Sequence, residues 1–284
     1  MTSLPAGSPL NDALSESGWS PVDPAFLHKR ILSEVFLTQH RDAGDEHRFR
    51  LVIPRGHSAV TGMHVPTILG VEAIRQVGLA LCQVHGAVPL DWAVVLQEAS
   101  VAWVVGPPLW GASEHVELEA RCRIVDARLR GEVMTVIVAR VEMLRDGKLI
   151  ATGGGSIRTL PIRAYEALRR HASATSDRVR PGGVSPLSRA TIVEGRVRAV
   201  LGWTHPDPFF FDHPVDHVPG MLFAQAALDA HAMLRGHPAR TVAVECTRFA
   251  ELDAPVEITA EDDGARCVTV FEQYGRQVAR VETG

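Results

Sequence analysis

Cysteine is scarce in this chain. The 284 residues contain only four cysteines, widely scattered and with no Cys-X-X-Cys pair, so neither a zinc site nor a disulfide framework is indicated. We expect reduced, buried thiols, which fits a cytoplasmic protein. The N-terminus lacks the basic start and apolar core of a signal peptide, and we find no apolar run long enough to span a bilayer.

An excess of positive charge is also missing. The net charge of −4 gives no electrostatic case for nucleic-acid or membrane binding. The composition, 46% hydrophobic and 22% charged, is typical of a soluble globular protein. The length allows two ordinary domains or one pseudo-symmetric domain with a large core.

What the chain does contain is a repeated helix motif. Residues 64–76 and 217–229 match at a constant offset of 153 (217 − 64). A second correspondence links residues 95–108 to 242–255 at an offset of 147 (255 − 108). Such duplication is typical of a dimer of repeats that became fused. The five matches in the first motif are His64 with His217, Pro66 with Pro219, Leu69 with Leu222, Glu72 with Gln225 and Ala73 with Ala226.

Each half reads as one buried helix followed by strands. The helices expected at about 66–84 and 219–234 are apolar almost all round, so each should be enclosed rather than lie on the surface. In the first half the period-2 stretches are 33–38, 48–54, 92–103, 115–125, 133–144 and 149–159, and Asp146-Gly147 marks a hairpin. A curved antiparallel sheet around one helix is a hotdog, and we therefore predict an α+β double hotdog.

The domain division follows composition. Residues 1–24 are rich in Ser, Pro and Gly, and we expect a disordered tail there. The N-terminal repeat should span 25–162 and the C-terminal repeat 187–284, the latter opening with a β-rich stretch at 191–203. The basic, Ala/Ser-rich stretch 163–186 between them is the expected linker.

The loop at 212–221 is expected to lead into the second helix. Pro219 suits the first helical turn, and Gly220 lets a ligand approach the amides there. Those amides have no partner within the helix and lie at the positive end of its dipole, so a carbonyl or phosphate oxygen could rest on them.

Three motifs together resemble a known family. They are Pro-Arg-Gly-His at 54–57, Val-Glu-Ala-Ile-Arg-Gln at 71–76 and Phe-Phe-Phe-Asp-His-Pro-Val-Asp-His-Val-Pro-Gly-Met at 209–221. The sequence from about residue 28 onward is similar to the A-factor biosynthesis (AfsA-like) hotdog family of γ-butyrolactone synthases. Each helix motif more distantly resembles the β-hydroxyacyl-ACP dehydratases.

The resemblance implies an acyl transfer. A β-ketoacyl group would pass from an acyl-carrier-protein thioester to a hydroxyl of dihydroxyacetone phosphate, and the ester would then close to a butenolide phosphate. Neither a metal nor an organic cofactor is implied. Two alternatives remain: a thioester dehydratase or thioesterase on the same fold, and a non-catalytic acyl-ligand-binding protein. A homodimer is possible, although fusion already satisfies the hotdog pairing.

Glu72 is the first candidate catalytic residue. A carboxylate in the middle of an apolar helix must be solvated, paired or functional. If functional, Glu72 would accept or orient the proton of the attacking hydroxyl, with its pKa raised by burial; otherwise it is an exposed carboxylate beside Arg75. In the dehydratases loop and acid come from different protomers, so the resemblance implies that Glu72 faces Gly220, whose amide would polarise the thioester carbonyl.

Arg248 is the second candidate. It follows Glu245 in the strand expected after the second helix, and its counterpart in the first half, Val101, is apolar. A guanidinium suits phosphate or carboxylate recognition, so Arg248 is either a substrate contact or a partner for Glu251. Glu245 is a further candidate for substrate binding.

The loop at 212–221, here called the motif loop, carries two histidines with neighbouring acids. We expect His213 to face the substrate, whereas His217, matched by His64, is expected to brace the helix. Asp212 and Asp216 lie close enough in sequence to orient them, and a two-His, two-Asp metal site is the alternative interpretation. Three further residues are expected to play supporting roles at the substrate: Gln76, one turn after Glu72, His57 and Arg55.

Overall fold

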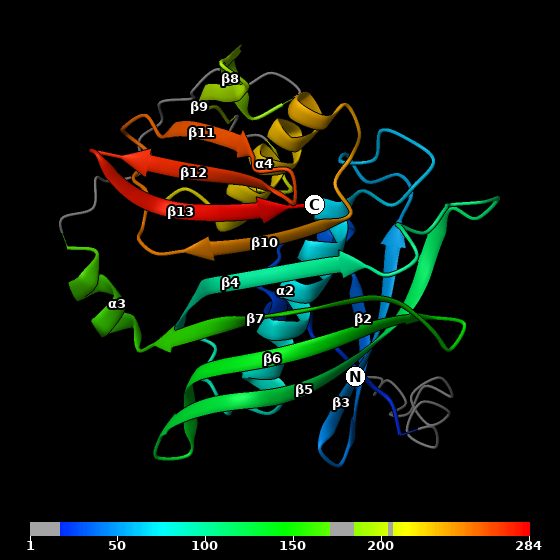
Figure 1. The fold of residues 1–284 in the computed structure, drawn as a ribbon. Helices are drawn as coiled ribbons and strands as arrows, with labels where there is room; N and C mark the ends of the chain where they lie inside the picture. Colours follow the sequence, from blue (N-terminus) through cyan, green and yellow to red (C-terminus); the bar gives the residue numbers. More distant parts are fainter. Residues whose placement is uncertain (1–17, 171–184, 204–206) are drawn as a thin grey trace, which may run out of the picture.

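One continuous antiparallel sheet dominates the computed structural model, which describes residues 18–170, 185–203 and 207–284. Its thirteen strands follow the order β1-β2-β3-β5-β6-β7-β4-β10-β13-β12-β11-β9-β8. The sheet wraps around α2 (Thr67–Val84) in the first half and α4 (Gly220–Arg235) in the second (Figure 1). The predicted double hotdog is therefore confirmed.

The first repeat contributes seven strands and the second contributes six. Pairing runs from the short edge strand β1 in one half to β8 in the other. In chain order the first seven are β1 (Ser20–Pro21), β2 (Leu37–Ala43), β3 (Glu46–Pro54), β4 (Ala93–Trp103), β5 (His115–Arg130), β6 (Val133–Arg145) and β7 (Lys148–Leu160). The other six are β8 (Leu187–Val193), β9 (Arg196–Leu201), β10 (Thr241–Cys246), β11 (Glu257–Asp262), β12 (Cys267–Gln273) and β13 (Arg276–Thr283).

Local sequence explains the tight turn between β6 and β7. Asp146 and Gly147 connect β6 to β7, and both have positive φ angles, 51° and 74°. Two consecutive left-handed residues match the twist of a tight hairpin, and Asp-Gly adopts that conformation at low cost. The predicted hairpin is confirmed.

Glycine allows α2 to lie close to the sheet. A Cβ built on Gly78 would come within 2.7 Å of Cδ1 of Ile157 on β7, and one on Gly70 within 2.9 Å of the Trp103 ring on β4. Real Cβ atoms are not found this close, so larger residues at these positions would push the helix away from the sheet. Among the described residues, α2 is the one helix long and apolar enough to cross a bilayer by length and composition, contrary to the prediction, but 78% of it is buried inside the protein.

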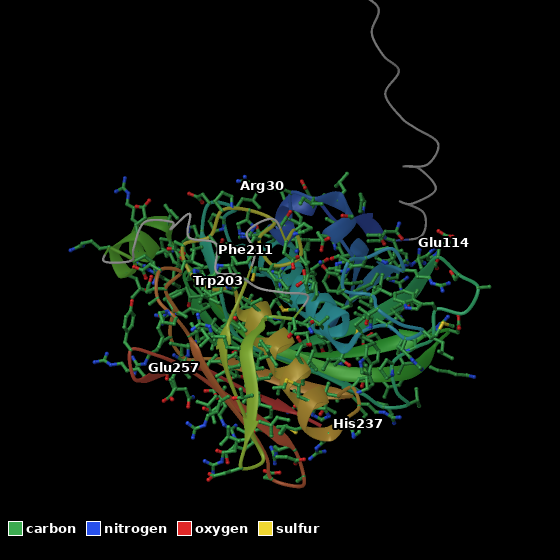
Figure 2. All side chains as sticks on the ribbon, turned by 90° about the horizontal axis from the view of Figure 1, so that it is seen from above. Arg30, Glu114, Trp203, Phe211, His237 and Glu257 are labelled. Atoms are coloured by element: carbon green, nitrogen blue, oxygen red, sulfur yellow. The ribbon has the colours of Figure 1, made fainter. Side chains whose placement is uncertain are left out.

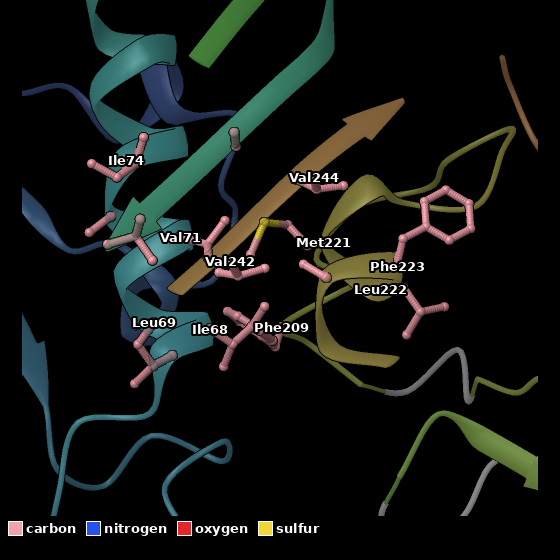
Figure 3. Packing of buried hydrophobic residues seen from close by; sticks show 14 of the residues in the cluster. Ile68, Leu69, Val71, Ile74, Phe209, Met221, Leu222, Phe223, Val242 and Val244 are labelled. Atoms are coloured by element: carbon pink, nitrogen blue, oxygen red, sulfur yellow. The ribbon is translucent and has the colours of Figure 1, made fainter. Parts of the chain in front are cut away.

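The two repeats share one hydrophobic core. Strand β10 pairs antiparallel with β4, from Thr241 opposite Ala102 to Glu245 opposite Glu98. Ile68 and Val71 of α2 lie on the side of Met221 of α4, with Val242 and Val244 of β10 packed beside them (Figure 3). Because these side chains are all buried, neither repeat can leave the other without exposing apolar surface.

Three boundaries differ from the predictions. Residues 18–24, expected in a disordered tail, include β1 and the buried Trp19, which stacks under Arg50 of β3. The expected linker begins with a helix, α3 (Ile162–Leu168), while residues 171–184 lie outside the described residues. The expected stretch 191–203 is two strands, because Glu194 and Gly195 turn the chain between β8 and β9. The division into repeats at 25–162 and 187–284 remains an interpretation.

The expected strand at 33–38 is also wrong. Leu32–Glu34 forms a 3-10 turn, and the amides of Phe36 and Leu37 donate to Oε1 of Gln76 at 2.9 and 3.4 Å. A side chain of α2 thus takes the hydrogen bonds that a strand partner would have taken, and β2 begins only at Leu37.

Candidate active site

A cavity of about 590 Å³, here called the inner chamber, lies where the two repeats meet. Helix α2, the N-terminus of α4, the motif loop and the segment after β10 each contribute to its wall. Figure 2 shows Arg30 and Phe211 on the same side of the molecule. The amide of Arg30 donates to Asp212 of the motif loop, so these two parts of the chain are in contact. The polar wall residues are His28, Lys29, Glu72, Arg75, Gln97, Arg158, Arg169, Asp212, His213, His217, Cys246, Thr247, Arg248 and Glu251.

Glu72 sits at the centre of a buried charge cluster. Its two carboxylate oxygens accept hydrogen bonds from Nε and Nη2 of Arg75 at 2.7 and 2.8 Å. Gln76 donates to Oε1 at 2.8 Å, and Nζ of Lys29 lies 3.6 Å from the same oxygen. The side chain is 1% exposed, so both interpretations made from the sequence need revision: Glu72 is paired with Arg75, but in the interior.

The pKa of Glu72 moves in the direction opposite to the prediction. Burial alone raises it, but the charges of Arg75 and Lys29 and the hydrogen bonds from Arg75 and Gln76 outweigh burial and hold the pKa at about 2. A carboxylate that is this acidic and this fully hydrogen-bonded is a weak base. The predicted raised pKa of Glu72 is therefore wrong, and the residue is better suited to holding two cations in place.

His213 lines the same chamber. Its Nδ1 is buried and has no hydrogen-bond partner among the described residues. Burial lowers the pKa of His213; Asp212 opposes this, while Arg75, Arg30 and Lys29 add to it. The imidazole is therefore neutral at pH 7 and can accept a proton.

The two acids of the motif loop do different work. Asp212 accepts hydrogen bonds from the amides of Arg30 and Ile31 at 2.6 and 2.9 Å, so it anchors the loop instead of orienting His213 as expected. Asp216 does orient its histidine: Oδ1 lies 2.7 Å from Nδ1 of His217.

Gly220 is the first residue of α4 and lines the chamber. The first-turn amides of a helix have no acceptors within the helix, so they remain available to a ligand oxygen. A Cβ at this position would lie 3.1 Å from Sγ of Cys246, which is tighter than an ordinary contact. The sequence therefore supplies a glycine where the backbone borders the cavity.

Arg248 lines the chamber with an exposed side chain that contacts no acid among the described residues. Glu251, its suggested partner, is instead bound by Arg169 through Nη1 and Nη2 at 2.8 and 2.9 Å. Arg169 also donates to Asp216 at 3.0 Å. With Glu251 occupied elsewhere, the structure favours the substrate-contact interpretation of Arg248.

The comparisons with known proteins agree with this geometry. The sequence profile described as the A-factor biosynthesis hotdog domain (AfsA) matches residues 12–161 and 186–283. This chain belongs to the A-factor biosynthesis hotdog family. The resemblance read from the three motifs is confirmed.

Relatives in this family carry one enzyme name. A 2-oxo-3-(phosphooxy)propyl 3-oxoalkanoate synthase of Streptomyces virginiae is 32% identical over 279 residues, covering 88% of this chain and 92% of the relative. A protein of the same name from Streptomyces coelicolor is 24% identical, covering 90% and 88%. Among solved structures, an acyl-ACP thioesterase from Bacteroides thetaiotaomicron has a TM-score of 0.53 at 11% identity, covering 84% of this chain and 97% of that one, which shows the shared hotdog fold alone.

Four predicted residues do not line the inner chamber of this AfsA-family chain. Gln76 is fully buried and braces Glu34, Phe36 and Glu72. His57 is buried behind Phe209, with Nε2 2.9 Å from Glu34. Arg55 and Glu245 are exposed and away from the cavity: Arg55 follows β3, and Glu245 lies opposite Glu98 in the β10–β4 ladder. These residues are close in sequence to the motifs of the site, but their side chains do not reach the chamber in the folded protein.

Several chamber residues were missed. Lys29 is 8% exposed and contacts Glu72, while His28 lines the chamber beside it, with its pKa lowered to about 4 by burial and by Arg75 and His213. Tyr165 of α3 was also missed; it does not line the chamber but donates to Asp216 at 2.7 Å. Lys29 could have been found from its position just before the first apolar segment. Tyr165 and Arg169 were missed because residues 163–186 were predicted to be a linker.

The metal alternative at the motif loop has no geometric support. Among residues 18–170, 185–203 and 207–284, no three His, Cys, Asp or Glu side chains gather in the way a metal ion requires. Asp212 and Asp216 hydrogen-bond to different parts of the chain.

Proposed function

We propose that this protein joins a 3-oxoacyl group to a hydroxyl of dihydroxyacetone phosphate, giving a 2-oxo-3-(phosphooxy)propyl 3-oxoalkanoate. One observation carries the proposal: a single chamber contains a neutral histidine, helix-terminal amides and an unpaired arginine. These are the groups that acyl transfer to a phosphorylated alcohol requires. The predicted activity agrees with the name of the relatives that cover most of this chain.

The acyl donor is a thioester whose chain enters the apolar part of the chamber. Leu79, Phe210, Met221 and Phe223 contribute to this wall, alongside the catalytic groups. Phe209 packs edge-on against His57 at 4.9 Å between ring centroids, which fixes one side of the wall. We propose an acyl carrier protein in the cytoplasm as the source of the thioester.

His213 acts as the general base. As the acceptor hydroxyl attacks the thioester carbonyl, its proton moves to the imidazole, and the carbonyl oxygen becomes negative. The amide of Gly220 donates to that oxyanion, aided by the positive end of the α4 dipole. When the tetrahedral intermediate collapses, the C–S bond breaks and the departing thiolate takes the proton from the imidazolium.

Arg248 binds the phosphate of the acceptor. Its side chain has no acidic partner among the described residues, so phosphate binding does not require breaking an existing ion pair. Asp216 holds His217, and Asp212 anchors the motif loop to the amide of Arg30.

Glu72 acts as a positioning residue. It holds Arg75 and Lys29 at the chamber wall, and both cations lower the pKa of His213. Glu72 thus keeps the base neutral through its partners and has no proton-transfer step of its own. After acyl transfer, the ester closes by an intramolecular aldol-type condensation to a butenolide phosphate.

Mass spectrometry of the purified protein with a 3-oxoacyl thioester, with and without dihydroxyacetone phosphate, tests this function. We expect the phosphorylated ester or butenolide only when both substrates are present. Hydrolysis of the 3-oxoacyl thioester alone would instead identify a thioesterase, and loss of water from a 3-hydroxyacyl thioester, assayed in parallel, would identify a dehydratase. Tight binding of the thioester without any product would identify an acyl-ligand-binding protein.

A further inference from the structure

A second cavity, of about 430 Å³, lies on the outer face of the sheet and is here called the outer cavity. It is bordered by the ends of β5 and β7, the starts of β4 and β6, and the first turn of α3. Three arginines line it, and its wall contains no acidic residue. Its lining is Trp92, Gln97, Arg128, Arg130, Thr135, Val136, Arg158, Thr159, Leu160, Pro161 and Ala164.

Strand register places two of these arginines side by side on the solvent face. Arg128 of β5 and Arg158 of β7 both pair with Val136 of β6, so the three side chains project from the same face of the sheet. Ile157, the neighbour of Arg158, is buried against Gly78 of α2. Since side chains alternate along a strand, Arg158 and Arg128 must point away from the helix.

None of these arginines is neutralised by an acid. Arg128, Arg130 and Arg158 are exposed and make no ion pair among the described residues. Neighbouring strands are about 4.8 Å apart, so Arg128 and Arg158, two strands apart, are separated by about 10 Å at their backbones. Long guanidinium side chains at this spacing can converge on one small anion such as a phosphate.

The outer cavity adjoins the inner chamber. Gln97, Arg158 and Leu160 line both. The β4–β10 ladder ends at the pair Glu98 and Glu245, and the first residues of β4 have no partner on β10. Beyond this pair, Thr247 and Arg248 stay hydrogen-bonded to Val278 of β13, and the first residues of β4 pair only with β7, so no strand pairing among the described residues closes the sheet between them.

Helix α3 forms one wall of this opening. Pro161 and Ala164 line the outer cavity, whereas Leu168 and Arg169 line the inner chamber. Hydrogen bonds from Tyr165 and Arg169 to Asp216 fix the helix against the motif loop of the other repeat. The opening therefore has a rigid side that continues from one cavity to the other.

We propose that the outer cavity binds the phosphate of a 4′-phosphopantetheine arm, the group that carries the thioester on both acyl carrier proteins and coenzyme A. Arg128, Arg130 and Arg158 hold the phosphate at the surface. The arm then runs along Leu160 and Gln97 and delivers its thioester to the inner chamber, near Gly220. This inference rests on the proposed acyl transfer and adds the recognition site of the donor.

The double variant Arg128→Ala/Arg130→Ala tests the site. Arg158 is left in place because it also lines the inner chamber. We expect kcat/KM for a 3-oxoacyl-4′-phosphopantetheine donor to fall about 10- to 100-fold, since hydrogen bonds to a charged phosphate are lost. With the same acyl group on N-acetylcysteamine, which lacks the phosphate, kcat/KM should not change. Equal effects on the two donors, or no effect on either, would overturn the proposal.

Arg123→Ala is the matched control. Arg123 lies on β5, is exposed and is not part of either cavity. Its replacement removes a positive charge from the same strand, and the preference for the phosphorylated donor should persist. If Arg123→Ala reproduces the loss, general surface charge attracts the donor and the cavity does not.

Binding measured without turnover separates this inference from the proposed function. Calorimetric titration with 4′-phosphopantetheine itself should give saturable binding to the wild type and at least about tenfold weaker binding to the double variant. If no thioester supports transfer but this difference remains, the phosphate site stands and the acyl transfer fails. If the wild type does not bind 4′-phosphopantetheine, the site is refuted.

The source of the arm is decided by comparing acyl-coenzyme A with the acylated carrier protein. The double variant should weaken both, because both contain the same phosphate. A loss confined to the carrier protein, with binding of free 4′-phosphopantetheine unchanged, would show that the arginines contact the protein surface of the carrier and would overturn the proposal.

Discussion

Each repeat has a hydrogen bond between an amide side chain and a carboxylate on its central helix, but the positions of the two residue types are reversed between the repeats. In α2, Gln76 donates to Glu72 at 2.8 Å; in α4, Gln225 donates to Asp229 at 2.7 Å. The offset of 153 places Gln225 at the position of Glu72 and Asp229 at that of Gln76 (229 − 76 = 153). Carboxylate and amide have thus traded places one helical turn apart.

The surroundings of the two carboxylates explain why only one belongs to the candidate site. Glu72 is held by Arg75 and Lys29, and its pKa is lowered. Asp229 accepts from the hydroxyl of Ser185 at 2.5 Å, and burial raises its pKa. Arg75 has the apolar Leu228 as its counterpart. Both helices carry a carboxylate, but among the described residues only that of Glu72 has cationic partners, so Lys29 and Arg75 distinguish the two repeats more than the carboxylate does.

The largest expected effect is on catalysis. Replacing His213 by Asn removes the base, and kcat/KM should fall by about 10²–10⁴-fold, the usual contribution of general-base catalysis. The melting temperature should change little, because Nδ1 of His213 makes no hydrogen bond within the described residues. The exposed His115→Asn serves as control. Retained activity in His213→Asn would remove this residue from the mechanism.

The next effect is on stability and compares the repeats directly. Glu72→Gln leaves Lys29 and Arg75 without their anion, and the free energy of unfolding should fall by about 3–5 kcal/mol. Asp229→Asn should cost about 1 kcal/mol or less, because Ser185 can reverse its hydrogen bond. Urea denaturation measures both. Equal losses would mean that the cations do not distinguish the repeats.

The stability difference should also depend on pH. The folded-state pKa of Glu72 is depressed, so its contribution is complete above the unfolded value of 4.5 and is lost as pH falls toward about 2. The gap between wild type and Glu72→Gln should therefore narrow over that range.

A smaller effect is expected on acceptor binding. Arg248 has the apolar Val101 as its counterpart in the first repeat, so only the second repeat supplies a cation at this position. Arg248→Ala should raise KM for dihydroxyacetone phosphate by about 10- to 100-fold and leave KM for an N-acetylcysteamine thioester unchanged. Arg276→Ala, at an exposed position on β13, is the control. A rise in both KM values would instead indicate a distorted chamber.

The smallest effect concerns the pH profile. The pKa of His213 is lowered below 6.5 by burial and by Arg75, Arg30 and Lys29, so the acidic limb of kcat/KM should lie below pH 6.5. Arg30→Gln removes one of these cations, favours the imidazolium and should move the limb to higher pH. The exposed Arg196→Gln should leave it in place. An unmoved limb in Arg30→Gln would show that another group titrates.

The fold was largely predictable because its signals are local or repeated. The offset of 153 revealed the duplication, the all-round apolar pattern revealed two enclosed helices, and Asp146-Gly147 located a hairpin. The candidate site was predictable only in part. The motif loop gave His213 and Gly220, but the low pKa of Glu72 depends on Arg75 and also on Lys29, which only tertiary folding brings to it.

The pairing of β4 with β10, which joins the sheets of the two repeats, has an evolutionary consequence. In a homodimer every substitution appears twice, so both composite sites must change together. Joining the two copies in one polypeptide chain frees each copy to accumulate its own substitutions, while the β4–β10 pairing and the shared core preserve their docking. Subfunctionalisation within a single gene product then becomes possible: one site specialises in chemistry, and the other is released from selection for it.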